Sequence, residues 1–519
     1  MFCSGCRCRA ALWGCDVEAL TSLAYGFSVA ATPFNLMLAL VGAALGTAIG
    51  ALPGIGPINA IVLLLPFCFS LNLPPESALI MLAGLYYGSG YGGRISSILL
   101  NIPGDPGLAM TTIDGYPLAQ QGRGAAALAI SGIGSFIGGT LTVVLLTFLA
   151  VPLARLAVSF GPSEYVALMV MSFALLSTMG GGRMAKTWAA IAVGLLLAMV
   201  GIDGGSGVER FTFGSLELLG GIDFTTLTIG LFAVSEILVV VEGLRTGKVA
   251  EFSGGERLRT PEVIRCLPAM LRSTGIGFFA GILPGTGAAV ASALAYTAEK
   301  RISDRGTFGK GDMRGLAAPE TADNAAQTAS MVPMLALGIP GSGTTAVLLG
   351  ALLLYSITPG PLLFTQRPEI AWGLIASMYI GNVMLLVLNL PLVGLFARLL
   401  LVPYWILFPA ILALSYAGVY AATNSAFELV LTTIIGVIAY GMRKLEVPLI
   451  PLLIAFVLER LLEDNLRRAL SLSDGSPVIL FTSPFAIVFW LLAALVVLLP
   501  LIAPRFRARV RDLSEGEES

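Results

Sequence analysis

Histidine is absent from this chain of 519 residues, and charged residues are scarce. Without histidine the chain cannot contain a Ser-His-Asp triad, an HExxH zinc site or a histidine proton relay. Any proton or cation chemistry must therefore use aspartate or glutamate. Charged residues make up 12% of the sequence, whereas soluble domains carry about 25%. These absences argue against histidine-based enzymes and against a soluble globular fold.

Cysteine is scarce beyond the start of the chain. Four of the six cysteines, Cys3, Cys6, Cys8 and Cys15, lie within the first fifteen residues. Their irregular spacing and the lack of histidine make a metal clip the less favoured interpretation. The same stretch lacks the clean apolar core of a signal peptide. We expect residues 1–17 to be a leader that precedes the fold.

Opposite charges are balanced overall, with 30 lysine and arginine residues against 31 aspartate and glutamate residues. No basic face with interleaved aromatics suggests a nucleic-acid partner. Basic residues cluster at Arg245–Arg272, at Lys300–Arg314 and in the segment RFRARVRD near the end of the chain. The positive-inside rule places all three in the cytoplasm. We therefore expect a cytoplasmic loop at 244–272 and a cytoplasmic tail at 504–519.

Long apolar runs dominate what is present. Hydrophobic residues make up 56% of the chain, and its mean hydropathy is +0.88. Because a transmembrane helix needs roughly 20 apolar residues, these runs predict an all-α, polytopic integral membrane protein with about 12 spans plus re-entrant or broken helices. The candidate segments are 34–52, 58–73, 77–100, 125–151, 163–179, 186–202, 224–243, 273–298, 328–357, 370–396, 404–421, 425–441, 445–459 and 484–503.

Two Leu-Pro-Gly motifs stand in the same apolar setting, GALPGIG at Gly50–Gly56 and GILPGTG at Gly281–Gly287. Each is followed by an Ile-Pro-Gly motif, at Ile102–Gly104 and Ile339–Gly341. The offsets between the copies are similar, since 281 − 50 = 231 and 339 − 102 = 237. The chain is therefore predicted to contain two copies of one unit, each with two interruptions in membrane-grade sequence.

Such interruptions indicate a transporter. Broken helices are tolerated in lipid only where their free backbone groups are buried or line a wet cavity, and paired interruptions point to the binding site. We assign the repeats to residues 18–243 and 273–503, inverted if each crosses the membrane an odd number of times. The stretch 273–298 lies between two basic clusters. We favour a re-entrant hairpin there, with Leu283–Gly285 near its tip, over a plain kinked span.

The segment Tyr87–Pro117 is the first candidate binding region. Its prolines break the helix, and a new helix that starts after a break presents free N–H groups at its positive end, which suits a carboxylate. The alternative is that the small and hydroxyl residues simply allow close helix packing. The predicted substrate-binding residues of the first copy are Pro53, Gly54, Arg94, Ser96, Ser97, Asn101, Thr111 and Thr112.

The segment Pro319–Gly350 is its counterpart in the second copy. Ionisable groups at membrane depth are functional candidates, so Glu320, Asp323 and Asn324 are predicted to couple transport to Na⁺ or H⁺. The alternative for Asp323 and Asn324 is a helix N-cap near the cytoplasmic surface. The predicted substrate-binding residues of this copy are Pro284, Gly285, Ser342, Thr344 and Thr345.

For the remaining ionisable residues in apolar sequence we expect structural roles. Glu236 is expected to pair with an arginine of another helix, Glu164 to cap a helix or sit at the interface, and Asp114 to form a turn. Arg94 needs an anion or access to water. A carboxylate substrate, Glu164 or Asp114 could supply that anion.

At these residues the sequence resembles the large membrane subunit of the tripartite tricarboxylate transporters, the TctA-type permeases. The likeness runs from about residue 18 to residue 483. One departure is Arg94, where the family pattern YGGS has a small hydroxyl residue. The motifs that carry the likeness are GTAIGALPGIGP, YGGRISSILLNIPGDPG, TTIDGYPLA, ILPGTGAAVASALAYTAEKR, FGKGDMRGLAAPETADNAA, VPMLALGIPGS, PGPLLF and MYIGNVMLLVLNLPLVGLFARLL.

The resemblance implies a multi-pass secondary transporter of the bacterial inner membrane. Such systems work with a small four-span membrane subunit and a periplasmic solute-binding protein. They import citrate or other small carboxylates by symport with a cation, without a further cofactor. A channel, a structural subunit of a membrane complex and a membrane enzyme are the alternatives. The enzyme is disfavoured because no convergent acid–base set is visible.

Overall fold

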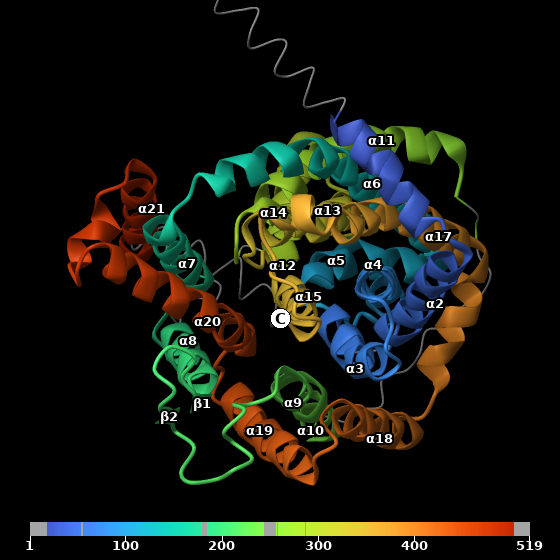
Figure 1. The fold of residues 1–519 in the computed structure, drawn as a ribbon. Helices are drawn as coiled ribbons and strands as arrows, with labels where there is room; N and C mark the ends of the chain where they lie inside the picture. Colours follow the sequence, from blue (N-terminus) through green and yellow to red (C-terminus); the bar gives the residue numbers. More distant parts are fainter. Residues whose placement is uncertain are drawn as a thin grey trace, which may run out of the picture.

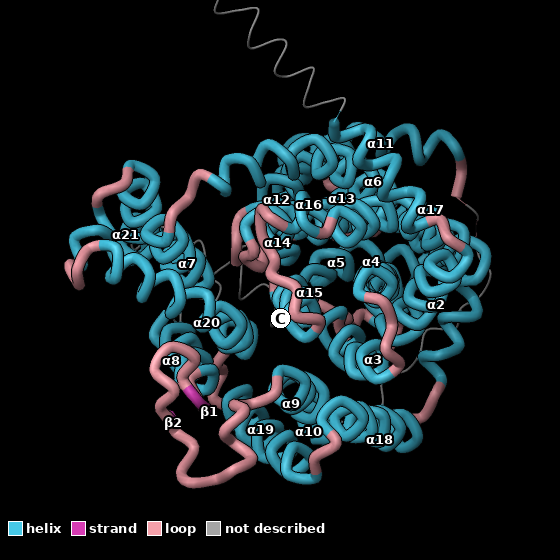
Figure 2. Tube along the Cα trace, in the orientation of Figure 1, coloured by secondary structure: helices cyan, strands magenta, loops and turns pink. Residues whose placement is uncertain are grey.

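The computed structural model describes residues 18–52, 55–178, 184–242, 256, 258–285 and 287–502. Within these ranges the chain is helical apart from one short antiparallel pairing between β1 (Gly201–Ile202) and β2 (Glu209–Arg210). The tube view shows the helices joined by loops, with an extended loop around β1 and β2 before α9 (Figure 2). The predicted all-α class is confirmed for the described part of the chain.

The helices follow the predicted apolar segments closely. After a first helix at residues 18–30, they are α2 (Pro33–Gly50), α3 (Pro57–Ser70), α4 (Pro75–Leu100), η1 (Pro106–Leu108), α5 (Ala109–Leu118), η2 (Ala119–Arg123), α6 (Gly124–Val158), α7 (Pro162–Ser177), α8 (Met184–Ala198), α9 (Phe224–Thr228), η3 (Ile229–Val234), α10 (Ser235–Glu242), α11 (Thr260–Ile282), α12 (Gly287–Ser303), α13 (Met313–Ala329), α14 (Met331–Leu337), α15 (Gly343–Leu354), α16 (Leu363–Gln366), α17 (Pro368–Ala397), η4 (Arg398–Leu401), α18 (Tyr404–Thr423), α19 (Ala426–Lys444), α20 (Leu449–Leu472), η5 (Pro477–Phe481) and α21 (Pro484–Ile502).

The chain is a multi-pass membrane protein. Six helical stretches of the described residues are long and apolar enough to cross a bilayer, namely Pro33–Gly50, Pro106–Val158, Phe224–Glu242, Pro368–Leu400, Trp405–Thr423 and Ala426–Lys444. Shorter apolar helices accompany them, at Pro57–Ser70, Pro162–Ser177, Met184–Ala198, Gly343–Leu354 and Pro484–Leu498. Large exposed apolar side chains on the outer helices, such as Val387 of α17 and Leu491 of α21, suit contact with lipid.

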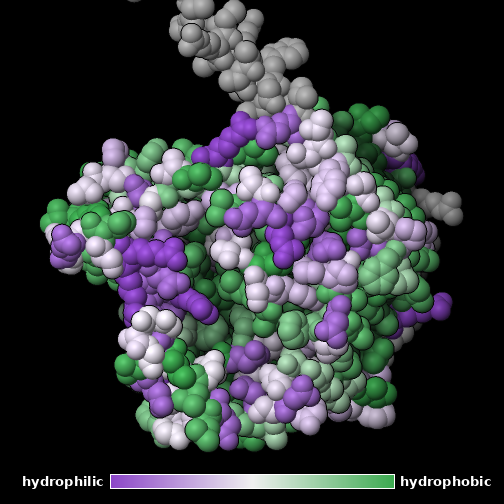
Figure 3. Space-filling view, viewed as in Figure 1, coloured by the Kyte–Doolittle hydropathy of each residue, from purple (hydrophilic) through white to green (hydrophobic). Residues whose placement is uncertain are grey.

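The helices are arranged in a central group with two flanking groups (Figure 1). The central group contains α2 to α6 and α11 to α15, with α17 along its side. One flank is formed by α7, α8, α20 and α21, and the other by α9, α10, α18 and α19. In the space-filling view, hydrophilic residues gather across the centre and on the α20 side of this face, and hydrophobic residues cover much of the remainder (Figure 3).

Glycines hold two pairs of central helices in close contact. A Cβ atom on Gly46 of α2 would lie 2.4 Å from the carbonyl oxygen of Leu85 in α4, and one on Gly277 of α11 would lie 2.4 Å from that of Ala322 in α13. Only glycine permits such an approach. The two contacts are related by the offsets of the sequence motifs, because 277 − 46 = 231 and 322 − 85 = 237. The same kind of contact joins Gly42 to Met81, Gly50 to Ser89 and Gly281 to Ala326.

Two helices of the central group end in the same way. Asn101 follows α4 and Gly338 follows α14, and both adopt the left-handed conformation, with φ of 59° and 71°. A left-handed residue is a usual helix C-cap, and 338 − 101 is again 237. Residues 101–105, here called the first break, then lead into η1. Residues 338–342, the second break, lead into α15.

The segment predicted as a hairpin contains two helices, α11 and α12, which pack on each other and on α13. Their junction at Leu283–Gly285 coincides with the second Leu-Pro-Gly motif. Helix α11 begins at Thr260, so part of the range 244–272 that was expected to be a loop is helical. Charged residues such as Glu262 and Arg272 lowered the hydropathy of this part and hid the helix.

Candidate functional site

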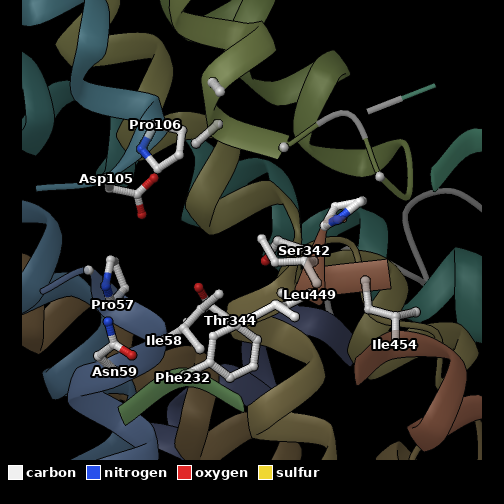
Figure 4. Close-up of a pocket in the computed structure, with 18 of the residues that line it drawn as sticks. Pro57, Ile58, Asn59, Asp105, Pro106, Phe232, Ser342, Thr344, Leu449 and Ile454 are labelled. Carbon is white, nitrogen blue, oxygen red and sulfur yellow. The ribbon is translucent and has the colours of Figure 1, made fainter. Parts of the chain in front are cut away.

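A cavity of about 570 Å³ lies where the helix breaks meet. Its inner wall comes from the first residues of α3, from both breaks, from the α11–α12 junction and from α13, and its outer wall comes from η3, α10, α19 and α20. Figure 4 shows Asp105 on one side of this space and Ser342 and Thr344 on another. The two breaks, one from each predicted repeat, therefore line the same cavity.

Unpaired acidic oxygens lie on the first-break side. Asp323 is fully buried in the middle of α13, and its Oδ2 accepts a hydrogen bond of 2.7 Å from Nε2 of Gln327. Its Oδ1 and the Oε1 of Gln327 have no hydrogen-bond partner among the described residues. Asp105 lines the cavity, and its Oδ1 accepts from the backbone N–H of Gly107 at 3.0 Å. A buried acceptor without a partner destabilises the fold. A ligand that contacts these oxygens would remove that penalty.

Helix η1, which follows the first break, contacts the unpaired carboxylate directly. A Cβ atom on Gly107 would lie only 2.2 Å from Oδ1 of Asp323. The backbone therefore approaches Asp323 as closely as glycine permits. Asp105, two residues earlier, is held at the same tip by its bond to Gly107. The first break and α13 thus form one acidic wall, although residue 105 and residue 323 come from different halves of the chain.

The opposite side is neutral and rich in donors. Ser342 caps α15, because its Oγ accepts from the backbone N–H of Thr345 at 3.2 Å while Thr345 Oγ1 accepts from the N–H of Ser342 at 2.8 Å. Thr344 also lines the cavity. The N-terminus of α15, which carries a partial positive charge, therefore faces this side. The N-terminus of α3 lies on the acidic side, because a Cβ atom on its N-cap residue Gly56 would lie 3.6 Å from Oδ2 of Asp105.

The outer wall is apolar except for one ion pair and for Glu446, which pairs with Lys186. Phe232, Leu449 and Ile454 supply apolar surface (Figure 4). Glu236 and Arg443 line the cavity and pair with each other at 2.5 Å, which confirms the expected arginine partner of Glu236. Among the described lining residues Arg443 is the one cationic side chain. The described lining residues therefore include no unpaired cationic side chain that could bind an anion.

Arg94 lies elsewhere, in a buried polar cluster behind the cavity. Its guanidinium carbon lies 4.0 Å from the ring centroid of Tyr91, and its Nη1 donates to Ser135 Oγ at 3.2 Å. The same Ser135 donates to Glu320 Oε2 at 3.4 Å, and Thr111 donates to Glu320 Oε1 at 2.6 Å. These five residues form the Arg94–Glu320 cluster. Arg94 therefore sits among protein partners on α4, α6 and α13.

Asn324 belongs beside that cluster, since its Nδ2 donates to Ser135 and to the carbonyl of Glu320. The N-cap of α13 is Asp312. Asp323 and Asn324 lie three turns further on and are fully enclosed, so the alternative that they cap a helix near the surface is wrong. Burial in mid-helix is what makes the unpaired oxygen of Asp323 chemically significant.

Three predicted substrate residues line the cavity, namely Gly285, Ser342 and Thr344. Others make local bonds instead: Ser96 and Ser97 both donate to the carbonyl of Gly93, and Thr112 donates to that of Ala109. Asn101 caps α4, Thr345 closes the first turn of α15, and Pro284 is buried at the α11–α12 junction. Pro53 and Gly54 lie outside the described residues.

Two further acids have structural partners. Glu164 accepts from the backbone N–H of Gly161 and caps α7, as expected. Asp114 lies inside α5 rather than in a turn, and its side chain accepts from Tyr296 and from three backbone N–H groups. Those N–H groups belong to Gly309, Gly311 and Asp312. Asp114 thus ties α5 to the loop that precedes α13, which corrects the prediction of a turn former.

Sequence reasoning missed Asp105 and Gln327 as site residues. A signal for Asp105 was present, since it stands 342 − 105 = 237 residues before Ser342 and therefore occupies the matching place after the first Ile-Pro-Gly. Gln327 follows Asp323 by one helical turn, which puts both on one face of α13. Comparing the two copies position by position would have identified both residues.

The chain was compared with known proteins. The family model for the tripartite tricarboxylate transporter TctA family matches residues 36–454. An uncharacterized 52.8 kDa protein in the TAR-I ttuC' 3' region of Agrobacterium vitis is 41% identical over 476 residues, which are 91% of this chain and 94% of that protein. An uncharacterized protein in the TAR-II ttuC' 3' region of Agrobacterium vitis is 41% identical over 234 residues, or 45% of this chain and 96% of that protein. No solved structure matches.

These matches agree with the motifs and with the fold. The family model covers most of the chain, and the longer relative aligns over nearly its whole length. The described helices include several that can cross a bilayer. The chain therefore belongs to the tripartite tricarboxylate transporter TctA family, as a multi-pass membrane transporter subunit and not an enzyme.

Proposed function

We propose that this chain is the large membrane subunit of a binding-protein-dependent secondary transporter that imports small organic carboxylates by cation symport. It would act in the bacterial inner membrane with a small four-span subunit and a periplasmic solute-binding protein. The observation that carries the proposal is the cavity between the two breaks, which has the N-terminus of α15 on one side and Asp105 on the other, with the unpaired Oδ1 of Asp323 buried behind that acidic wall. A channel would not need this pairing of opposite chemistries.

The substrate carboxylate binds on the neutral side of the cavity in this proposal. The N-terminus of α15 contributes roughly half a positive charge there and offsets part of one negative charge. Ser342 and Thr344 add neutral donors at the same place. A dianion or trianion then retains negative charge that a co-transported cation must offset, which makes symport the expected mode.

The two halves act as structural repeats in this proposal, covering residues 18–243 and 273–503. The matched glycine contacts and the matched left-handed caps, both related by 231 and 237 residues, support the repeat. An inverted arrangement would bring the two breaks to the bilayer midplane from opposite sides. The packing of α11 on α12 supports the re-entrant hairpin. In this proposal the segment 244–272, whose last part belongs to α11, and the tail 504–519 lie in the cytoplasm.

Reconstitution tests this function. The chain is incorporated into liposomes with its small subunit and its solute-binding protein, and uptake of labelled mono-, di- and tricarboxylates is measured under separate Na⁺ and H⁺ gradients. Concentrative uptake that collapses with the cation gradient is the expected result. Flux that merely equilibrates the substrate and shows no counterflow would indicate a channel. Uptake that is unaffected when this chain is omitted would make it a structural subunit.

A further inference from the structure

We infer that Asp105, Asp323 and Gln327 form a binding site for a monovalent, oxygen-coordinated cation of the sodium class at the tip of the first break. The inference deepens the proposed function, on which it rests, by naming the coupling ion and its ligands. It draws on two independent observations. One is the set of unpaired oxygens, and the other is a difference between the two halves of the chain.

The unpaired oxygens converge from two elements. Oδ1 of Asp323 and Oε1 of Gln327 are acceptors without a partner among the described residues, and their side chains are 0% and 5% exposed. Asp105 adds a carboxylate from the first break, where Gly107 bridges the two acids through its N–H and its close approach. Hard cations such as sodium, magnesium and calcium take oxygen ligands of this kind. One proton can join at most two acceptors, whereas a cation can contact all three side chains.

The matching positions of the other half lack this chemistry. By the offset of 237, Asp105 corresponds to Ser342 and Asp323 corresponds to Tyr86, which also lines the cavity. Gly107 likewise corresponds to Thr344, since 344 − 107 = 237. One half-site therefore carries carboxylates around a glycine, and the other carries hydroxyl groups.

This asymmetry assigns opposite ligands to the two half-sites. The acidic half-site attracts a cation, and the hydroxyl half-site with the α15 N-terminus suits an anion. Gln327 lines the same cavity as Ser342 and Thr344, and its Oε1 lies 2.9 Å from where a Cβ atom of Gly90 in α4 would stand. Asp105, Gln327 and Thr344 line the cavity and Asp323 lies directly behind its acidic wall, so a cation bound at that wall and a carboxylate bound at Thr344 would attract each other. That attraction is the physical basis of coupling.

Direct binding to the purified full-length chain tests the inference without substrate or partner proteins. Binding of radioactive sodium is measured by scintillation proximity, and the thermal unfolding midpoint is measured in sodium chloride and choline chloride at equal ionic strength. Saturable binding and a sodium-dependent rise of the midpoint are expected. Asp323→Asn should weaken sodium binding by about 10- to 100-fold, the range found when supporting groups of metal sites are removed. Asp105→Asn and Gln327→Leu should weaken it in the same direction.

Glu428→Gln is the matched control. Glu428 is also buried and has an unpaired Oε2, but it lies in α19 on a flanking group of helices, whereas Asp323 packs against Gly107 next to the first break. Its variant should bind sodium like the wild type. Gln327→Leu keeps both carboxylates, so it keeps the test valid if Asp323→Asn fails to fold.

Several results would overturn the inference. These are equal sodium affinity in Asp323→Asn and wild type, displacement of sodium by micromolar calcium or magnesium, or a midpoint that responds to pH but not to sodium. Failure of the proposed function looks different, since the chain would then bind sodium normally while the reconstituted system takes up no carboxylate.

Discussion

Gly107→Ala should uncouple the chain while leaving it folded. An alanine Cβ would lie 2.2 Å from Oδ1 of Asp323 and 3.2 Å from Cβ of Ala288, whereas ordinary contacts begin at 3.4 Å. The first break and Asp323 must then separate by about 3.4 − 2.2 = 1.2 Å. Overpacking of this kind costs about 1–3 kcal/mol. If the strain is relieved by moving Asp323 away from the cation, sodium affinity falls about 5- to 150-fold, at 1.4 kcal/mol per tenfold.

The assay for Gly107→Ala combines sodium binding to the purified chain with cation-driven uptake in the reconstituted system. Gly275→Ala is the matched control, because a Cβ atom at that α11 position meets nothing within 4 Å. The control should bind sodium and transport normally. Wild-type sodium affinity and wild-type uptake in Gly107→Ala would refute the reasoning, since they would mean that the contact between the first break and Asp323 is unimportant.

Three further perturbations follow from the structure. Arg94→Ser should leave the charge of Glu320 uncompensated and destabilise the fold by about 3–5 kcal/mol. The protein that still folds should keep its preference among mono-, di- and tricarboxylates, and a changed preference would place Arg94 at the substrate. Pro284→Ala should restore a backbone donor at the α11–α12 junction and lower uptake at near-normal protein level, as measured in membranes; normal uptake would make this break irrelevant to transport. The hydrogen bond from Ser206 holds the pKa of Asp203 below its usual range, so its stabilisation of the loop at 201–221 is present above about pH 4 and is lost as the pH falls further. The protection of the loop amides, expressed relative to their intrinsic exchange rate at each pH, should therefore fall at acid pH in wild type, and Asp203→Asn should abolish that fall.

Much of the architecture could be predicted because it depends on local sequence. Apolar runs and prolines set the helices and their breaks, and the equal offsets between motifs reappear as equal contacts, such as Gly46 on Leu85 and Gly277 on Ala322. The capping role of Glu164 could also be predicted, because a glutamate three residues after an N-cap position is a local sequence signal. Features encoded within one or two helical turns were therefore recoverable.

The site itself depends on contacts between distant parts of the chain. The closeness of Asp323 to Gly107 arises from the packing of α13 against η1, which hydropathy does not reveal. Arg94 meets Ser135 of α6 for the same kind of reason. Asp114 shows how tertiary structure overrides a local signal, since the sequence Asp-Gly-Tyr-Pro suggests a turn and yet lies in a helix that binds a distant loop.

The central claim is that one cavity binds carboxylate and sodium together, and substrate protection of a cysteine within it tests this most directly. Ala289 lines the cavity, and the described cysteines, Cys68 and Cys266, are buried. In Ala289→Cys, made in a background in which Cys3, Cys6, Cys8 and Cys15 are replaced by serine, a small thiol reagent should label the new cysteine, and carboxylate should protect it only when sodium is present. Adding Asp323→Asn should remove that protection. Equal labelling under all conditions, or protection by carboxylate without sodium, would contradict the account.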